Sequence, residues 1–186
     1  MVQFCSILFD QMMQSNLSII TPKNGILVVN TLLTGLLAGV FFTWTNAITP
    51  GIGLLEDLEY LQAFQHMNRT ILNPLFYVVI MGPVLLSFAS FYFHKSNPKI
   101  ISRLTISAAA FYLTGVFLVT LLGNIPLNDL LDKTNLADMS LVDAKVLRGK
   151  FETPWNNLHL IRTITSASSF LLLIISCLFS NNNLNK

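Results

Sequence analysis

Four long runs of apolar residues dominate the sequence, and shorter polar stretches separate them. The runs cover about residues 26–48, 71–93, 104–125 and 158–180. Each is long enough for an α-helix that crosses a bilayer, which needs about 20 residues. None alternates apolar and polar positions as membrane-barrel strands do, and a segment in hydrocarbon must satisfy its own backbone groups. The pattern predicts an all-α fold, an integral membrane four-helix bundle forming a single domain over residues 1–186.

The stretches between the runs have patterns of their own. Residues 1–24 lack the basic start of a signal peptide and contain Asp10, so we expect a retained tail or an interfacial helix. An interfacial helical segment is also expected before the second run. Residues 129–154 mix Leu and Val with charges and are predicted to form an amphipathic loop before the fourth run. We interpret this loop as a solvated interfacial helix, with a lid or a partner surface as the alternative.

Composition excludes several classes of protein. Hydrophobic residues make up 53% of the 186 residues and charged residues 11%, whereas soluble domains carry about 25% charged residues. The net charge is only +2 and no basic tract is present, which excludes nucleic-acid binding. Cys5 and Cys177 have no C-x-x-C neighbour, so no thiolate metal site or dithiol redox motif is expected.

The basic residues predict an orientation in the cell membrane. Four spans place both termini and the 94–103 loop on one side, where all charged residues of that loop are basic. The basic residues on this side are Lys23, Lys95, Lys99, Arg103 and Lys186, and the acid is Asp10. Because cytoplasmic loops are enriched in Lys and Arg, we predict a multi-pass protein with both termini in the cytoplasm.

Small residues in the first run predict close helix packing. Gly35 and Gly39 form a G-x-x-x-G pair, which allows the backbones of two membrane helices to approach closely. We therefore expect a compact bundle.

Polar residues gather at the span ends on the predicted non-cytoplasmic side. In the fourth run, Trp155, His159, Arg162 and Ser166 are spaced so that a helix places them on one face. Arg162 is the only charged residue within a run, and a guanidinium at the bilayer centre costs about 2.5 to 3.5 kcal/mol. We therefore expect it to face the bundle interior and to pair with a carbonyl or with an acid. The candidate acids are Glu56, Asp57, Glu59 and Asp129.

A second polar group precedes the second run. His66, Arg69 and Asn73 share a helix face provided that the helix continues to Pro74. His66 and His159 could supply two of the four ligands of a metal site, but no carboxylate or cysteine accompanies either histidine at ligand spacing. No metal site is expected.

Each of these residues also has an ordinary structural explanation. Trp44 and Trp155 suit the aromatic belt of a membrane protein, and Asn124 and Asn128 suit a helix-ending turn around Pro126. Arginines near span ends can extend to the interface. These explanations do not account for the convergence of all the residues on one end of the bundle.

Four short motifs stand at these span ends in a fixed order. They are Trp44, Asn46, Pro50 and Gly51; Phe64, Gln65, Asn68 and Arg69 with Asn73, Pro74 and Phe76; Gly123, Asn124, Pro126, Leu127 and Asn128; and Phe151, Glu152, Pro154, Trp155, Arg162 and Thr163. In this order the motifs resemble those of the anthrone-oxygenase-like family of small membrane proteins, over about residues 26–180. One position departs from the family pattern: His159 stands where the family commonly has Asn, and it can titrate near neutral pH.

The resemblance implies oxidation of an anthrone-like apolar aromatic by O₂ without a cofactor. An anthrone is acidic beside its carbonyl, and its carbanion reduces O₂ directly. His159 is then the expected base, and Arg162 and Arg69 are expected to stabilise the enolate or superoxide. The expected substrate-binding residues are Trp44, Asn46, Asn68, Asn73, Phe76, Asn124, Asn128 and Trp155.

The alternative is a membrane protein without turnover. The same polar residues then cross-link the helices or bind a lipid, a quinone or a partner membrane protein. Transport is disfavoured because no acidic residue lies within a run. A cavity beside His159 and Arg162 favours an enzyme or small-molecule binder, whereas a packed bundle with paired polar side chains favours the structural alternative.

Overall fold

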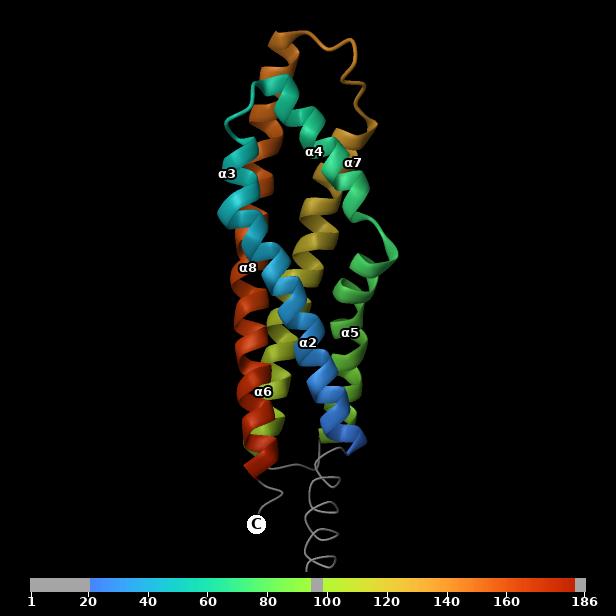
Figure 1. The fold of residues 1–186 in the computed structure, drawn as a ribbon, viewed down its shortest axis with the longest axis vertical. Helices are drawn as coiled ribbons and strands as arrows, with labels where there is room; N and C mark the ends of the chain where they lie inside the picture. The colour runs from blue at the N-terminus through green and yellow to red at the C-terminus, as the bar shows by residue number, and fades with distance from the viewer. Residues whose placement is uncertain (1–20, 95–98, 183–186) are drawn as a thin grey trace, which may run out of the picture.

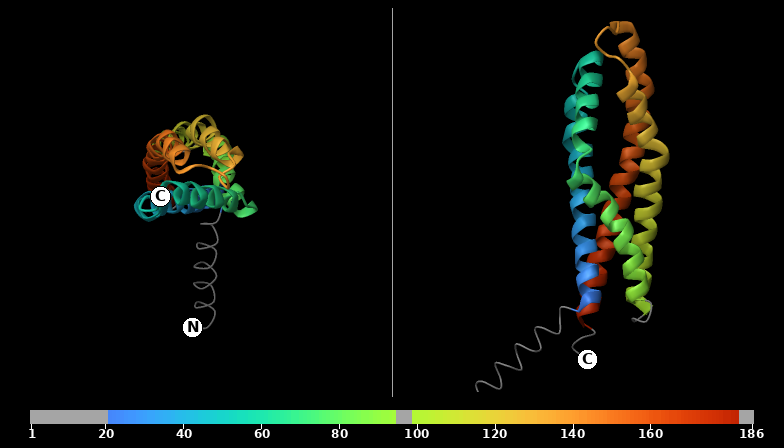
Figure 2. Two further views of the ribbon diagram at one scale, coloured as in Figure 1. Left: turned by 90° about the horizontal axis from the view of Figure 1, so that it is seen from above. Right: turned by 90° about the vertical axis from the view of Figure 1, so that its right-hand side faces the viewer.

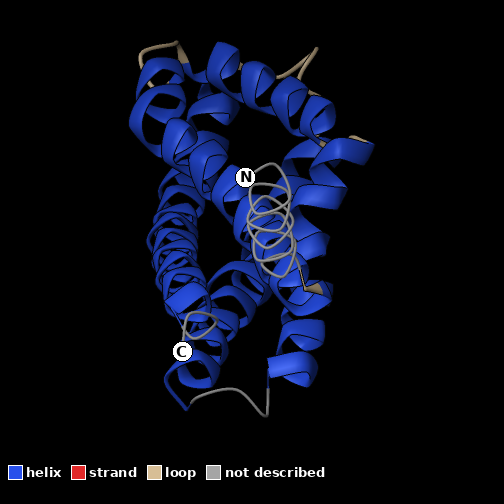
Figure 3. Cartoon of the chain, turned by 60° about the horizontal axis from the view of Figure 1, so that its bottom comes forward, coloured by secondary structure: helices blue, strands red, loops and turns tan. Residues whose placement is uncertain are grey.

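The computed structural model describes residues 21–94 and 99–182. The expectations for the tail up to residue 20, with Cys5 and Asp10, and for Lys95 and Lys186 lie outside these residues. All regular structure within the described ranges is helical (Figure 3). The elements are α2 (Pro22–Thr43), the π-helical segment η1 (Trp44–Ile48), α3 (Thr49–Ile52), α4 (Asp57–Ile71), α5 (Pro74–His94), α6 (Lys99–Ala110), the π-helical segments η2 (Phe111–Leu118) and η3 (Thr120–Asn124), α7 (Ile125–Lys133) and α8 (Leu141–Asn182).

Several of these elements join end to end into four long rods. The rods Pro22–Ile52, Pro74–Phe93, Lys99–Lys133 and Leu141–Ser180 are long and apolar enough to cross a membrane. They contain the first, third and fourth predicted spans, and the second predicted span begins three residues before its rod, at the end of α4. Apolar side chains such as Leu32, Phe88, Leu122 and Ile164 remain exposed on their outer surfaces, as expected of a surface that contacts lipid.

The four rods form a bundle, and α3, α4, α7 and the start of α8 form a cap at one end of it (Figures 1 and 2). α2 packs against α5 and α8, and α6 packs against the same two helices. Figures 1 and 2 show α3, α4, α7 and the start of α8 at the end opposite the start of α2 and the end of α8. The four polar groups singled out in the sequence therefore lie at one end of the bundle, as predicted.

Local sequence fixes where the second rod begins. The chain leaves helical geometry at Leu72, and Pro74 starts α5. The Asn73 side-chain oxygen accepts a hydrogen bond from the backbone N–H of Phe76 at 3.0 Å, which caps the new helix. The helix does not continue to Pro74, which was the condition for His66, Arg69 and Asn73 to share a helix face. The prediction of a shared face is therefore wrong, because α4 ends before Asn73.

The segment 129–154 is helical over most of its length, as expected, but it belongs to the third and fourth rods and does not form a separate interfacial helix. α7 continues to Lys133, and α8 begins at Leu141 and passes through Pro154 without ending. The Ser140 hydroxyl accepts a hydrogen bond from the backbone N–H of Asp143 at 3.1 Å and so caps α8. Most of the predicted loop is thus helical, and its second half is the first part of the fourth rod.

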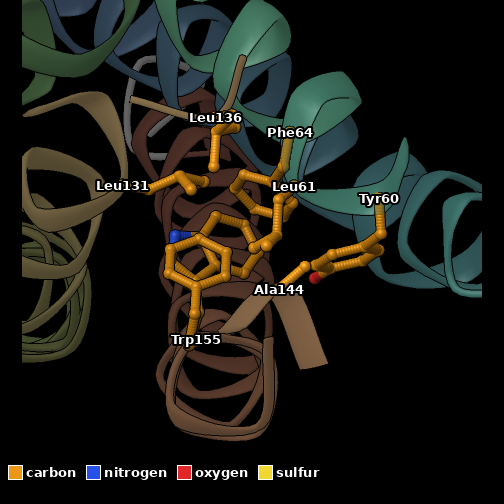
Figure 4. Packing of buried hydrophobic residues seen from close by; sticks show 8 residues of the cluster. Tyr60, Leu61, Phe64, Leu131, Leu136, Ala144 and Trp155 are labelled. Atoms are coloured by element: carbon orange, nitrogen blue, oxygen red, sulfur yellow. The ribbon is translucent and has the colours of Figure 1, made fainter. Parts of the chain in front are cut away.

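Three apolar clusters hold the bundle together along its length. The cap cluster, between α4, α7 and α8, contains Tyr60, Leu61, Phe64, Leu131, Leu136, Ala144, Phe151 and Trp155 (Figure 4). The middle cluster contains Leu37, Phe41, Val79, Ile80, Val84, Tyr112 and Val116, and the lower cluster contains Leu27, Ala108 and Leu173. The cap cluster fixes α4 and α7 above the spans.

Two glycines allow close helix contacts. A Cβ atom at Gly115 would lie 2.3 Å from Cγ2 of Thr165 on α8, and one at Gly35 would lie 2.5 Å from the Phe170 ring. Gly39, the second member of the predicted pair, has no atom within 4 Å of that position. Gly35 therefore packs within the bundle as expected, and Gly39 does not.

Candidate functional site

A cavity of about 330 Å³ lies just below the cap, at the lower end of the range of about 300 to 1,000 Å³ for small-molecule sites. Side chains from α2, η1, α4, α5, the η2–η3–α7 rod and α8 line it. Of the predicted site residues, the lining contains Trp44, Asn68, Phe76, Asn128, Trp155, His159 and Arg162. These seven residues, which the sequence grouped at one end of the bundle, therefore lie around one cavity.

Arg162 and His159 form the polar centre of the cavity. Nη2 of Arg162 lies 2.7 Å from Nδ1 of His159. Because a guanidinium can only donate, Nδ1 accepts and the ring proton is on Nε2. Nε2–H then donates to the carbonyl oxygen of Phe41 at 3.1 Å. Both ring nitrogens of His159 are thus engaged, and the neutral ring holds the guanidinium in place.

The partner of Arg162 was expected to be a carbonyl or an acid, and no acid binds it among the described residues. Among residues 21–94 and 99–182, no carboxylate pairs with Arg162, and no acidic side chain lines the cavity. The acids proposed from the sequence lie on α4, on the turn before it and on α7. The other partner of the guanidinium is Thr120, whose hydroxyl accepts from Nη1 at 3.4 Å. Arg162 is only 6% exposed, so its positive charge is buried without a counter-ion from the described part of the chain.

Aromatic rings take the place of an acid around this charge. The Arg162 guanidinium lies 4.8 Å from the centroid of Phe41 and 5.3 Å from that of Trp155, which stabilises a cation electrostatically. Trp155 stacks on His159 at 4.8 Å with an interplanar angle of 15°. Trp44 packs against Trp155 at 5.9 Å. The walls therefore suit a flat apolar ligand.

Three buried N–H donors at the cavity have no acceptor within the described part of the chain. They are Nε of Arg162, Nε1 of Trp44 and Nδ2 of Asn68, each on a residue that lines the cavity. A buried donor without an acceptor costs free energy. The three nitrogen atoms are closed off from the open space of the cavity, so a ligand oxygen would satisfy them only after the surrounding side chains shift.

Asn124 and Asn128 both fix Trp155. The side-chain oxygen of Asn128 accepts a hydrogen bond from the indole N–H at 2.7 Å, and Nδ2 of Asn124 donates to the Trp155 carbonyl at 3.3 Å. Asn128 lines the cavity, whereas Asn124 is fully buried outside the lining. The two asparagines therefore hold an aromatic wall in place.

π-Helical turns position several of the lining residues. Trp44 begins η1, Phe117 lies in η2, and Thr120 begins η3. Such turns are rare and occur often at functional sites, because each changes the direction of the following side chains. Sequence reasoning missed Phe41, Phe117 and Thr120. Thr120 had a weak signal, since it is a polar residue within an apolar run.

Other predicted site residues lie away from the cavity. Arg69 is exposed, and its Nε donates to Asp132 at 2.6 Å. Asn46 is exposed, and Asn73 serves as the cap of α5. His66 lines a separate surface groove with Arg69, so it does not join His159. The expected contacts of Arg69, Asn46 and Asn73 with a substrate have no support in this arrangement.

Arg148 fastens the cap and was not singled out in the sequence. Its guanidinium donates to the carbonyl oxygens of Gly53 and Leu55, both at 2.8 Å, and pairs with Asp57 and Glu152. It also covers the Tyr60 ring at 4.4 Å. Burial, with a smaller effect from Glu152, raises the pKa of the Tyr60 hydroxyl, so this group stays neutral. Arg148 thus ties the α3–α4 turn to α8.

Comparison with known proteins agrees with the sequence motifs. The sequence model of the anthrone oxygenase family matches residues 72–172. This match extends from the residues before α5 into α8 and includes Phe76, Thr120, Asn128, Trp155, His159 and Arg162. No curated protein and no solved structure matches the chain significantly. Since the family match covers more than half of the sequence, the chain belongs to the anthrone oxygenase family.

Proposed function

We propose that the cavity binds an anthrone-like aromatic and promotes its oxidation by O₂ to the corresponding quinone, without a cofactor. One observation carries the proposal: the Arg162 cation is buried in an aromatic cavity and lacks a carboxylate partner among the described residues. A ligand that becomes an anion on reaction supplies the missing negative charge. Stabilisation of developing charge by a fixed donor is a large term in enzyme catalysis.

The proposed reaction needs few protein groups. The bound anthrone loses a proton from the methylene carbon opposite its carbonyl, and the negative charge moves onto the carbonyl oxygen, beside Arg162. The carbanion adds to O₂, forming a C–O bond and a peroxide anion, which takes up a proton from water to give a hydroperoxide. Loss of water from this hydroperoxide, with the second hydrogen of the same carbon, leaves a new C=O. One oxygen atom of O₂ enters the quinone and the other enters water, so atoms and electrons balance.

Arg162 has a free donor for the enolate oxygen. Its Nε–H has no acceptor among the residues that the structure describes, while Nη2 remains on His159 and Nη1 on Thr120. An enolate that reaches this buried N–H after a small shift of the surrounding side chains would leave the contact between Arg162 and His159 in place. In this arrangement His159 holds Arg162, and the proton leaves to water. This assignment replaces the role of base expected for His159.

The proposal is tested with the purified protein in lipid nanodiscs. An anthrone is added, and O₂ uptake and quinone absorbance are followed together, with protein-free nanodiscs as the control. We expect faster oxidation than in the control, with one O₂ consumed per quinone formed. Oxidation at the control rate by helical, correctly folded protein would overturn the proposal. Binding of 9,10-anthraquinone without turnover would then favour the non-catalytic quinone-binding alternative.

A further inference from the structure

The cavity opens sideways, between two of the membrane-spanning rods. Leu72, Tyr77 and Met81 come from α5 or the residues just before it, and Leu121 and Ile125 come from the η3–α7 part of the third rod. All five line the cavity and are also exposed. Tyr77 is 51% exposed, Met81 38% and Leu121 48%. We call this set of five residues the mouth.

The mouth is apolar and belongs to the part of the molecule that suits a bilayer. Met81 lies in the rod Pro74–Phe93 and Leu121 in the rod Lys99–Lys133. The cap covers the other approach to the cavity, because Phe64 packs on Trp155 at 4.7 Å and Asn128 holds the indole N–H. A ligand from the aqueous side meets this packed cap, whereas one dissolved in lipid meets apolar side chains.

We infer that the ligand of the cavity enters from the bilayer through the mouth, and that Met81 and Leu121 limit which molecules pass. This inference rests on the proposed function only in that the cavity binds a small molecule. The ligand is accordingly a membrane-dissolved molecule with a flat apolar body. Its polar oxygen atoms would lie beside Arg162, Trp44 and Asn68 after passing the mouth, and a small shift of these side chains would bring their unpartnered donors within reach.

The chain carries a built-in reporter for the test. Its two tryptophans are Trp44 and Trp155, and both line the cavity. Stopped-flow fluorescence in nanodiscs follows their quenching by 9,10-anthraquinone, a planar probe that is not oxidised. The double variant Met81→Phe with Leu121→Phe narrows the mouth. The matched control, Leu85→Phe with Leu122→Phe, places the same side chains at exposed positions of the same rods outside the cavity lining.

A narrowed mouth changes rates and leaves equilibrium affinity alone. We expect the double mouth variant to slow association and dissociation together by about fivefold or more, with an unchanged Kd, because only the barrier to entry is altered. The control pair should bind at the wild-type rate. Wild-type association rates in the mouth variant would overturn the inference. Anthraquinone binding without anthrone oxidation would overturn the proposed function and leave the entry route standing.

A second measurement decides the case in which anthraquinone does not bind. In a Trp44→Phe background the single remaining tryptophan is Trp155, which is 4% exposed. Lipids brominated on their acyl chains should quench it when a chain reaches the mouth. We expect the narrowed mouth to reduce this quenching and the control pair to leave it unchanged. Equal quenching in the two pairs would overturn the inference.

Discussion

Nδ1 of His159 accepts a hydrogen bond from Arg162 over 2.7 Å, and Nε2–H of the same ring donates to the Phe41 carbonyl. The histidine therefore connects the α2 backbone to the buried guanidinium. A ring engaged at both nitrogens is a poor base, but it is a good support for a cation that has no carboxylate partner in the described chain.

Removal of the guanidinium should abolish most of the proposed activity. Arg162→Ala is expected to lower the rate of anthrone oxidation by about 100-fold or more, the usual effect of losing a group that stabilises an oxyanion. The measurement is quinone absorbance with O₂ uptake in nanodiscs. Arg69→Ala is the matched control, because Arg69 is exposed and paired with Asp132. Equal losses in the two variants would place the important charge outside the cavity.

The role of His159 is separated by two substitutions. His159→Asn keeps an oxygen that can accept a hydrogen bond from Arg162 and an N–H₂ group that can donate one to the Phe41 carbonyl. We therefore expect this variant to retain activity within about threefold of the wild type, which corresponds to a loss of less than about 1.4 kcal/mol. His159→Ala removes both contacts and should lose considerably more. If the Asn variant is as inactive as the Ala variant, His159 acts as the base expected from the sequence.

Close packing of the third rod against α8 is tested at Gly115. Gly115→Ala forces a methyl group against Thr165, whereas Gly39→Ala places one where no atom lies within 4 Å. We expect the first change to destabilise the protein by about 1 to 3 kcal/mol, as overpacking does, and the second to have little effect. Thermal unfolding in detergent measures both. A harmless Gly115→Ala would mean that the two helices can separate at no cost.

The cap should loosen when Arg148 is removed. Arg148→Ala loses the hydrogen bonds to the Gly53 and Leu55 carbonyls and the pairs with Asp57 and Glu152. Hydrogen exchange of the backbone amides at residues 53–57 should become at least about tenfold faster, which corresponds to roughly 1.4 kcal/mol of local stability. Lys150→Ala, an exposed neighbour on the same helix, is the control and should not change the exchange.

The predicted orientation is tested with single cysteines. In a variant without Cys5 and Cys177, Asn135→Cys lies in the turn after α7 and Lys99→Cys lies at the start of α6. A membrane-impermeant maleimide added to intact cells should label position 135 and spare position 99, because basic residues favour the cytoplasmic side. The reverse pattern would place the cap in the cytoplasm.

Periodicity predicted the fold and part of the site. Four apolar runs suffice to identify the spans, and the spacing of Trp155, His159, Arg162 and Ser166 identified a buried face of α8. These features depend on local geometry along one helix. The position of the four polar groups also followed from the sequence. Successive spans run in opposite directions, so the end of one span and the start of the next lie at the same end of the bundle.

The remaining features depend on contacts between distant segments. The sequence offered several acids as partners for Arg162, and none pairs with it, because the guanidinium is surrounded by Phe41 and Thr120 from other helices and by Trp155 from its own helix. The pairing of Arg69 with Asp132 requires α4 and α7 to meet. The π-helical turns that position Trp44 and Thr120 have no sequence signal of comparable strength.

The sideways mouth also bears on the supply of oxygen. O₂ dissolves more readily in hydrocarbon than in water, so the bilayer beside Met81 and Leu121 is a reservoir of the second reactant as well as of the aromatic one. A cavity that faces this reservoir would receive both reactants from the same phase. Turnover would then depend on the thickness and fluidity of the surrounding lipid, properties that an assay in detergent would not reproduce.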